Sequence, residues 1–407
     1  MTCVGRTPAG MTDVTDVRRP ARPRQVYPSV RSALTFLRRG TASSRRRPRS
    51  PGGEGKGNGA GRPHCTVARM CADSPRSPQF RLLLVMPGHQ LVRKGAELGF
   101  HIWSVWDPSL IEADFAPRIE EFSEQLLATD FDDETSLRAT ISRTAQSHGI
   151  DAVLHCGHGS SVLPVVREAW RLGLSPNPPA VYELLWAGEG DDRVPAEAPR
   201  VGVETLTVNG SHHVLGMTAQ RTTGPPHFFV TGYLHPAPLT DDEQKIIGAL
   251  VEERLTESGY RSGPAHTQVA LLPHGPRIVS CRAHPGTDRI PLLFEIARGF
   301  DLEAAVFRGL QGSRPVVPKA SRYAEVGFFL LPEGRLETYT GTEDIAVTPW
   351  VRGARFPYTV GDRVAPIGDP HARRAYVVVE GDTPEVTRER VAKARQDLVT
   401  DIRAATP

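Results

Sequence analysis

The stretch that most constrains the fold runs from Gly263 to Leu302, where β-prone runs, turns and an apolar segment follow one another. Thr267–Leu272 and Arg277–Ser280 are β-prone runs joined by a four-residue loop that contains Gly, which predicts a β-hairpin. Pro285-Gly286 then breaks the chain ahead of the apolar helical segment Pro291–Ala297. A hairpin that leads through a glycine turn into a helix predicts several side chains around one cleft.

The segment after residue 79 alternates apolar runs with amphipathic ones. The predicted strands are Arg81–Met86, Phe100–Trp106 and Ile150–Cys156, and the predicted helices are Gln90–Leu98, Glu134–Ser147 and Val162–Leu172. Continuous apolar runs of this length fit buried parallel strands. The β-α-β spacing therefore predicts a small parallel sheet with helices packed on it.

A glycine-rich loop follows the third predicted strand. It contains His155, Gly157, His158 and Gly159 and opens the next helix, so its backbone N–H groups can face an anion. Ligands bind at such strand ends in open α/β sheets. The histidines and Cys156 also suggest a metal or nucleophile site, but the loop has no acid and its His-x-x-His spacing is not that of a helical zinc site. We therefore expect the loop to line a substrate or cofactor cleft.

Three shorter patterns predict further elements. Asn209-Gly210 between two β-prone runs predicts a hairpin. Thr240, followed by three acids, predicts the start of a helix that ends near Ser258. Its expected inward residues are Ile246, Leu250 and Leu255. Pro384–Ile402 is amphipathic and predicts a C-terminal helix.

The hairpin and the turn after it resemble the C-terminal core of ATP-grasp ligases, in particular the carboxylate–amine and L-amino acid ligase branch. The residues that match the family pattern are His266, Thr267, Gly286, Asp288, Ile290 and Pro291. The resemblance implies an α/β protein with a small parallel N-terminal sheet, an α+β ATP-grasp core and a C-terminal α+β unit. The N- and C-terminal parts are similar to those of biotin carboxylases. It also implies ATP-driven activation of a carboxylate to an acyl-phosphate, which an amine then attacks, with ATP and Mg²⁺ as cofactors.

This chain departs from the family where the family carries its two metal-binding acids. Those positions hold Gln268 and Ser280, the acyl-phosphate arginine corresponds to His284, and Glu204 aligns with an acid of the active-site wall. Mg²⁺ prefers anionic oxygen, and a neutral carbonyl and hydroxyl offset little of the charge of Mg-ATP. The resemblance thus gives Gln268 and Ser280 as metal positions, Glu204 and His284 as catalytic ones, and Asp288 and Arg289 as cofactor-binding ones.

The family also carries a two-lobed segment, with phosphate-binding lysines and a glycine-rich lid, after the position of Pro179. Here the chain reaches the family's next strand at Val203, and no lysine lies between Lys94 and Lys245. Without such cations the phosphate charge of a nucleotide would be unbalanced. We therefore expect a truncated ATP-grasp core that is catalytically degenerate and retains ATP and Mg²⁺ poorly.

The N-terminal segment differs in charge from the rest of the chain. Residues 1–78 hold sixteen Arg and Lys and four acids, a net charge of +12, whereas residues 79–407 carry −9. A segment rich in Arg, Pro, Gly and Ser cannot bury enough apolar surface to fold, so we expect a disordered basic tail. A nucleic-acid-binding arm, a transit peptide and a start set too far upstream are the alternatives. The expected domains are 1–78 as the tail, 79–180 as an α/β domain before the core, 181–322 as the truncated core and 323–407 as the C-terminal α+β subdomain.

Cysteine content and hydropathy limit the cellular compartment in which this chain is expected. Five cysteines without regular spacing favour a reducing cytoplasm over a disulfide-bonded fold. No apolar run approaches the roughly 20 residues that span a bilayer. The implied partners are a small carboxylate and an amine, with a homodimer by resemblance and nucleic acid only through the tail.

Three alternatives to a degenerate ligase stay open at this point. The first is an active ATP- and Mg²⁺-dependent ligase of amino acids or peptides that works with substituted residues. The second is a non-catalytic binding or regulatory partner of a complete ligase. The third is a decayed gene or a faulty gene model, which the basic tail and the shortened core both favour.

Overall fold

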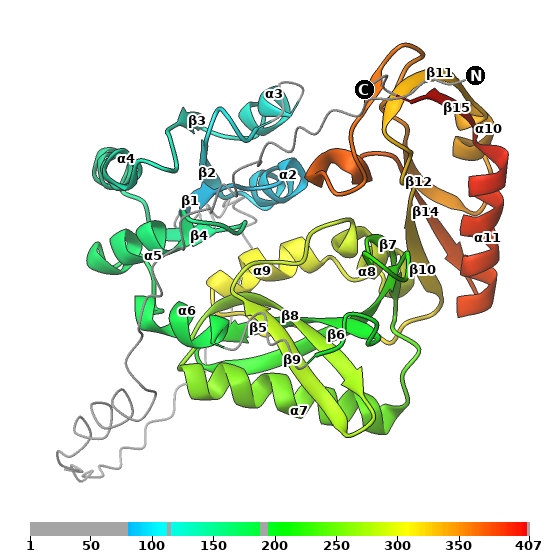
Figure 1. The fold of residues 1–407 in the computed structure, drawn as a ribbon. Helices are drawn as coiled ribbons and strands as arrows, with labels where there is room; N and C mark the ends of the chain where they lie inside the picture. Colours follow the sequence, from blue (N-terminus) through cyan, green and yellow to red (C-terminus); the bar gives the residue numbers. More distant parts are fainter. Residues whose placement is uncertain (1–79, 112–114, 188–193, 405–407) are drawn as a thin grey trace, which may run out of the picture. The chain divides into compact units, whose positions relative to one another are not determined.

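The computed structural model describes residues 80–111, 115–187 and 194–404, which all lie in one unit formed by residues 73–407 (Figure 1). The predicted tail, residues 1–78, falls outside the described residues. A four-stranded, an eight-stranded and a three-stranded sheet organise the described chain. None of the described helices combines the length and the apolar character that crossing a bilayer requires.

The four-stranded sheet is parallel throughout and has the order β3-β2-β1-β4. Its strands are β1 (Arg81–Val85), β2 (His101–Trp106), β3 (Gln125–Ala128) and β4 (Ala152–His155). The helices α2 (His89–Glu97) and α3 (Ala116–Glu120) pack on one face, and α4 (Glu134–His148) and α5 (Val162–Arg171) on the other. Helices on both faces explain why β1 is an unbroken apolar run. The predicted small parallel sheet is confirmed, with β3 as a strand that the sequence did not predict.

The eight-stranded sheet is antiparallel, in the order β12-β14-β10-β7-β6-β5-β8-β9. Its strands are β5 (Arg200–Val208), β6 (Ser211–Thr222), β7 (Val230–His235), β8 (Gly263–Leu272), β9 (Gly275–Arg282), β10 (Tyr323–Phe328), β12 (Val351–Arg355) and β14 (Tyr376–Gly381). The sheet joins the predicted truncated core to the predicted C-terminal unit, because β7 pairs with β10. The domain boundaries proposed from the sequence stay a prediction.

Two hairpins of this sheet were predicted from the sequence. Asn209 and Gly210 both have positive φ, 52° and 80°, and form the two-residue turn between β5 and β6. The hairpin of β8 and β9 is longer than predicted, because Leu272 pairs with Gly275. The four-residue loop was therefore wrong: Gly275, with φ of 114°, allows pairing to continue up to a two-residue turn.

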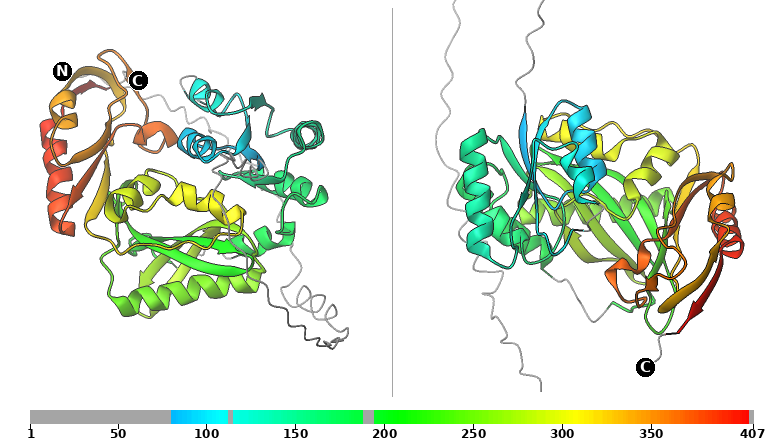
Figure 2. Two further views of the ribbon diagram at one scale, coloured as in Figure 1. Left: turned by 180° about the vertical axis from the view of Figure 1, so that it is seen from behind. Right: turned by 90° about the horizontal axis from the view of Figure 1, so that it is seen from above.

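Helices cover both faces of the eight-stranded sheet (Figure 1, Figure 2). On one face lies α7 (Asp241–Ser258), and on the other lie α8 (Ile290–Arg298) and α9 (Leu302–Leu310). The start of α7 is confirmed, since Thr240 forms a capping box with Glu243. Ile246 was wrongly predicted to face inward, because it is 57% exposed and the buried stripe is Ile247, Val251 and Leu255, spaced four apart.

The C-terminal segment forms α+β structure, as predicted. The helix α11 (Pro384–Asp397) ends before Ile402, so the predicted helix is too long. The last four residues of the predicted helix instead belong to β15 (Val399–Arg403), which pairs with β11 (Gly334–Thr340) in the sheet β13-β11-β15. The remaining elements are α6 (Pro179–Trp186), α10 (Thr342–Ala346), β13 (Arg363–Val364) and a 3-10 helix at Pro370–Arg373.

Candidate functional site

The two predicted metal positions face each other on the hairpin. Gln268 of β8 and Ser280 of β9 are direct cross-strand partners. The Gln268 side-chain amide donates to Oε1 of Gln220 at 3.3 Å. Within the described ranges, no group of three or more His, Cys, Asp or Glu side chains is arranged to hold a metal ion. An amide and a hydroxyl do not fit Mg²⁺, which is held by carboxylates and phosphate oxygens.

The chain is also short where the family has its extra lobe. Residues 187–199 connect α6 to β5, and 188–193 among them lie outside the described residues. The described chain holds no additional sheet between these two elements. The truncation of the core stays a prediction, and the structure shows a short connection between α6 and β5.

Glu204 on β5 is a buried carboxylate that ties a loop to the sheet. The His266 Nδ1–H donates to Glu204 Oε1 at 2.5 Å, and the Gly286 N–H donates to Oε2 at 3.1 Å. A Cβ at residue 286 would lie 2.6–2.7 Å from the carboxylate atoms, so only glycine fits there. Burial alone would lower the pKa of His266, but the charge of Glu204 and its hydrogen bond outweigh burial and raise this pKa.

The loop that Glu204 holds continues into a strained turn. Asp288 and Arg289 both have positive φ, 54° and 73°, a conformation that side chains other than glycine rarely adopt. Nη1 of Arg373 donates to Asp288 Oδ2 at 2.7 Å, and the Tyr233 hydroxyl donates to the same oxygen at 3.4 Å. Strain of this kind persists where surrounding contacts impose it, and it clusters at functional sites.

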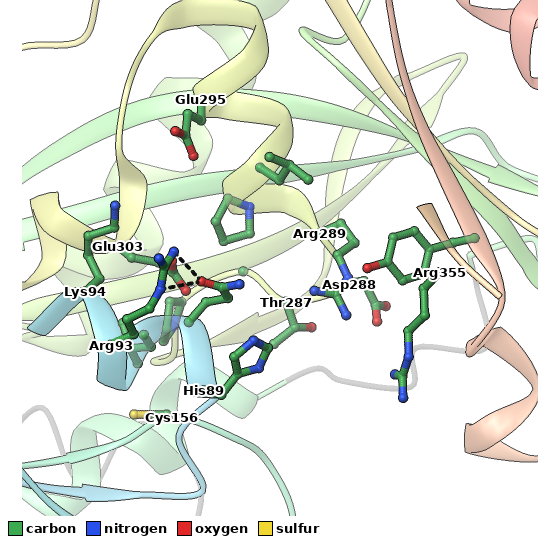
Figure 3. Close-up of a pocket in the computed structure, with 18 of the residues that line it drawn as sticks. His89, Arg93, Lys94, Cys156, Thr287, Asp288, Arg289, Glu295, Glu303 and Arg355 are labelled. Carbon is green, nitrogen blue, oxygen red and sulfur yellow. Dashed lines mark hydrogen bonds between the residues drawn. The ribbon is translucent and has the colours of Figure 1, made fainter. Parts of the chain in front are cut away.

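The larger of two cavities on this loop has a volume of about 440 Å³ and lies between α2, the start of α8 and the C-terminal strands (Figure 3). We call it the arginine cavity. Its lining includes six cationic residues, Arg93, Lys94, Arg289, Arg355, Arg373 and Arg374, and four acids, Asp288, Glu295, Asp301 and Glu303. The lining thus carries an excess of positive charge.

One side of the arginine cavity is held in place by rings. The Arg289 guanidinium lies over Tyr376, 4.6 Å from the ring centroid. The Arg373 guanidinium lies 5.5 Å from the ring centroid of Phe328. His89, at the start of α2, has a lowered pKa because burial and then the charges of nearby arginines disfavour the imidazolium. This side of the cavity therefore favours an anion.

The opposite side holds acids and a lysine, and Figure 3 shows Lys94, Arg93, Glu295 and Glu303 away from Arg289 and Arg355. Lys94 Nζ lies 2.7 Å from Asp301 Oδ2, an ion pair that raises the pKa of Lys94. Burial, and then the nearby Asp301 charge, raises the pKa of Glu303 to about 7. Glu303 can therefore exchange a proton near neutral pH.

Of the residues predicted in the glycine-rich loop, His155 is buried and His158 is exposed. The Gly157 N–H donates to His155 Nδ1 at 3.2 Å, so the His155 Nε2–H donates to Ser161 Oγ at 2.9 Å. His155 is buried and stays neutral, because burial lowers its pKa to about 3. His158 is exposed, and with its glycine neighbours it borders a second cavity of about 380 Å³.

His284 also lines that second cavity. The residue is 7% exposed, and burial lowers its pKa to about 4. The predicted residues therefore divide: Asp288 and Arg289 line the arginine cavity, and Gly157, His158, Gly159 and His284 line the second one. Gln268 and Ser280 lie on neither lining, and their predicted roles, like those of the other candidates, stay predictions.

Several cavity residues were missed by the sequence analysis. They are His89, Arg93, Lys94, Arg355, Arg373, Arg374 and Tyr376. They come from two segments that lie more than 250 residues apart in the chain. The available signal was the concentration of arginines between residues 352 and 374, which no strand or helix pattern explains.

Comparisons with known proteins agree with this architecture. Residues 327–403 match the L-amino acid ligase C-terminal domain 2. The solved L-amino acid ligase from Bacillus licheniformis has a TM-score of 0.67 and 15% identity, covering 80% of this chain and 99% of that one. Phosphoribosylglycinamide synthetase from Anaerococcus prevotii has a TM-score of 0.65 and 10% identity, covering 80% of this chain and all of that one.

Two further relatives complete the picture. The biotin carboxylase domain of Hydrogenobacter thermophilus 2-oxoglutarate carboxylase, solved with MgADP and bicarbonate, has a TM-score of 0.59 and 14% identity over 80% of this chain and 92% of that one. The uncharacterized protein y4rH of Sinorhizobium fredii is 23% identical over 252 residues, 59% of this chain. The chain spans about half the length of y4rH, 51%. The resemblance to ATP-grasp carboxylate–amine ligases is thus confirmed at the level of fold.

Proposed function

We propose that this chain, which has the fold of ATP-grasp carboxylate–amine ligases, binds a small carboxylate in the arginine cavity. We propose further that it does not perform Mg-ATP-dependent ligation. The observation that carries the proposal is the neutral Gln268–Ser280 pair at the family's metal positions, on a scaffold whose arginine cavity keeps an excess of cations. Charge is missing where a metal nucleotide would bind and present where an acid would bind.

The arginine cavity suits a carboxylate for geometric reasons. A guanidinium presents paired N–H donors that match the two oxygens of a carboxylate. Arg289 is oriented by Tyr376 and Arg373 by Asp288, so these donors need little reordering when a ligand arrives. Glu204 acts as a positioning residue in this proposal, because it fixes the loop that carries Asp288 and Arg289.

The acid–lysine side gives the proposed ligand a second anchor. Glu303 faces the cavity without a hydrogen bond to any described residue, and Lys94 is already paired with Asp301. A cationic group of the ligand would stabilise the charged form of Glu303 and lower its pKa. Affinity for such a ligand is therefore expected to rise as pH rises through about 7.

Binding is tested by isothermal titration with amino acids and simple mono- and dicarboxylates as probes. We expect at least one probe to bind, and Arg289→Gln to weaken that binding by about tenfold or more, the size of one lost charged hydrogen bond. Arg335→Gln is the matched control, because Arg335 is an exposed arginine on β11 outside both cavities. Equal affinity in wild type and Arg289→Gln would contradict the proposed site.

The alternative of an active ligase is tested separately by nucleotide turnover.

The proposal carries three further expectations. They are poor retention of ATP and Mg²⁺, a cytoplasmic location and a homodimer. A regulatory role beside a complete ligase is compatible with carboxylate binding, and a shift in oligomeric size on mixing with such a ligase would reveal it.

A further inference from the structure

The second cavity differs in chemistry from the arginine cavity. It is about 380 Å³ in volume, within the size range of small-molecule sites. Its nine described lining residues are Gly157, His158, Gly159, Val162, Tyr182, Trp186, Arg282, Ala283 and His284. None of them is acidic, two are large aromatics, and three are basic or potentially basic. This lining suits a small anion with an apolar, planar body.

The walls of the second cavity come from α5, α6 and β9, close to the connection between α6 and β5. Tyr182 and Trp186 lie on α6, which packs against β9 and precedes residues 187–199. Tyr182 is buried and Trp186 half-buried, so each presents part of its ring to the cavity. Val162, at the start of α5, is buried on the same lining. The apolar half of the cavity is therefore built by α5 and α6.

His284 supplies a hydrogen-bond acceptor to the lining of the cavity. Its Nδ1 lies 2.8 Å from the carbonyl oxygen of Pro285, and because a carbonyl only accepts, Nδ1 carries the hydrogen and donates. In a neutral imidazole, Nε2 is then an acceptor. His284 is 7% exposed and lines the cavity, so this acceptor is available to a ligand there. A ligand that carries an N–H or O–H group can donate to this acceptor.

Three features of the lining can attract a negative charge. They are His158, Arg282 and the start of α5. His158 is exposed at the mouth of the cavity, and Arg282 comes from the end of β9. The Ser161 side chain is engaged by His155 and does not cap α5, whose first turn carries a partial positive charge. These groups favour an anion in the cavity.

We propose that this second cavity is a binding site for a small aromatic carboxylate whose ring carries an N–H or O–H donor. The carboxylate lies toward His158 and Arg282, the ring packs against Trp186 and Tyr182, and the donor reaches Nε2 of His284. The site is distinct from the arginine cavity, because residues 282–284 line one and residues 285–289 the other. The loop that Glu204 anchors through Gly286 is the wall between them.

The test uses the full chain and three aminobenzoate isomers as probes, followed by ligand-observed NMR. We expect at least one isomer to bind, and its N,N-dimethyl analogue, which has no N–H donor, to bind about tenfold more weakly. His158→Ala and Trp186→Leu should each weaken the binding severalfold. Their matched controls are His274→Ala, at the exposed hairpin turn, and Trp170→Leu, on the exposed side of α5.

Absence of binding by every isomer up to about 10 mM would overturn the proposal, since that limit is weaker than ordinary specific sites. Equal binding by wild type, His158→Ala and Trp186→Leu would overturn it as well. Binding that Arg289→Gln abolishes, with the second-cavity variants unaffected, would assign the probe to the arginine cavity instead. Each outcome is read independently of the ligand that occupies the arginine cavity.

Discussion

Two regions of this α/β scaffold differ in charge. One is the facing pair Gln268 and Ser280 on the hairpin of β8 and β9, and the other is the arginine cavity. The first presents an amide and a hydroxyl, with the amide bonded to another glutamine. The second carries six cationic and four acidic side chains, several of them ordered by rings or ion pairs. A charged group in a partly buried place is costly unless it is paired or binds something. Under the proposed function, the arginine cavity uses its charge to bind an acid, and the hairpin positions offer no carboxylate to a metal nucleotide.

The largest effect is expected at the carboxylate that links the two regions. Glu204→Ala would leave the Gly286 N–H and the cationic His266 buried without their partner, at a cost of about 3–5 kcal/mol in the free energy of unfolding. Urea denaturation measures the change. Glu204→Gln keeps an acceptor for Gly286 and should cost less. A loss below about 1 kcal/mol in Glu204→Ala would show that the loop does not depend on this contact.

The second prediction separates two neighbouring imidazoles with opposite pKa shifts. The rings of His266 and His284 are nearly parallel, with centroids 6.3 Å apart. Glu204 raises the pKa of His266, and burial lowers that of His284 to about 4. An NMR titration should therefore show His266 charged at pH 6.5 and His284 neutral down to about pH 4. Simultaneous titration of both rings near pH 6.5 would contradict the assignment.

The same shifts give the two histidines opposite effects on stability. His284 is neutral in the folded protein, so its contribution is lost as pH falls below 6.5, by about 1.4 kcal/mol per pH unit down to about pH 4. His266 contributes stability that is fully present below pH 6.5 and is lost as pH rises through its raised folded pKa. Unfolding experiments on His284→Gln should show a shallower acid-side slope than wild type. An unchanged slope would contradict a neutral His284.

The third prediction concerns pH and the arginine cavity. Glu303 has a pKa of about 7, so a ligand with a cationic group should bind more tightly at pH 8 than at pH 6. The expected change in the dissociation constant is a few fold, because the pH range spans only one titration. Titration calorimetry at both pH values measures it. Glu303→Gln should remove the dependence, while an identical pH dependence in that variant would assign it to another group.

The smallest effect is expected from restoring acids on the hairpin. Gln268→Glu combined with Ser280→Glu places two carboxylates on facing strands, where they should bind Mn²⁺ weakly, at about millimolar affinity, because only two ligands come from the protein. Water-proton relaxation measures the bound ion. Wild type should show no such binding, and equal Mn²⁺ binding by both proteins would contradict the neutral-pair argument.

The sequence predicted the elements that local chemistry defines. The Asn209-Gly210 turn and the Thr240 cap follow from residues next to each other in the chain. It failed where a choice depends on distant contacts. Ile246 and Ile247 are equally apolar, and only packing against the sheet selects the second. Val399–Arg403 became a strand because β11 is available beside it.

The candidate site shows the same limit. The Gln268–Ser280 pairing follows from the hairpin register, so the neutral pair could be predicted. The arginine cavity could not, because five of its six cations come from α2 and from the segment before β14, which lie far apart in sequence. Glu204 was aligned with an active-site acid, but its partners His266 and Gly286 become evident only from the packing of the loop on β5.

The most direct test of the central claim is steady-state ADP release by the full-length protein with ATP, Mg²⁺ and a mixture of amino acids. A protein without carboxylates at the hairpin positions should release no more ADP than a protein-free blank, even at concentrations where a carboxylate occupies the arginine cavity. Sustained ADP release that depends on amino acid and disappears in Gln268→Ala would contradict the account, because it would mean that the neutral pair still supports nucleotide chemistry.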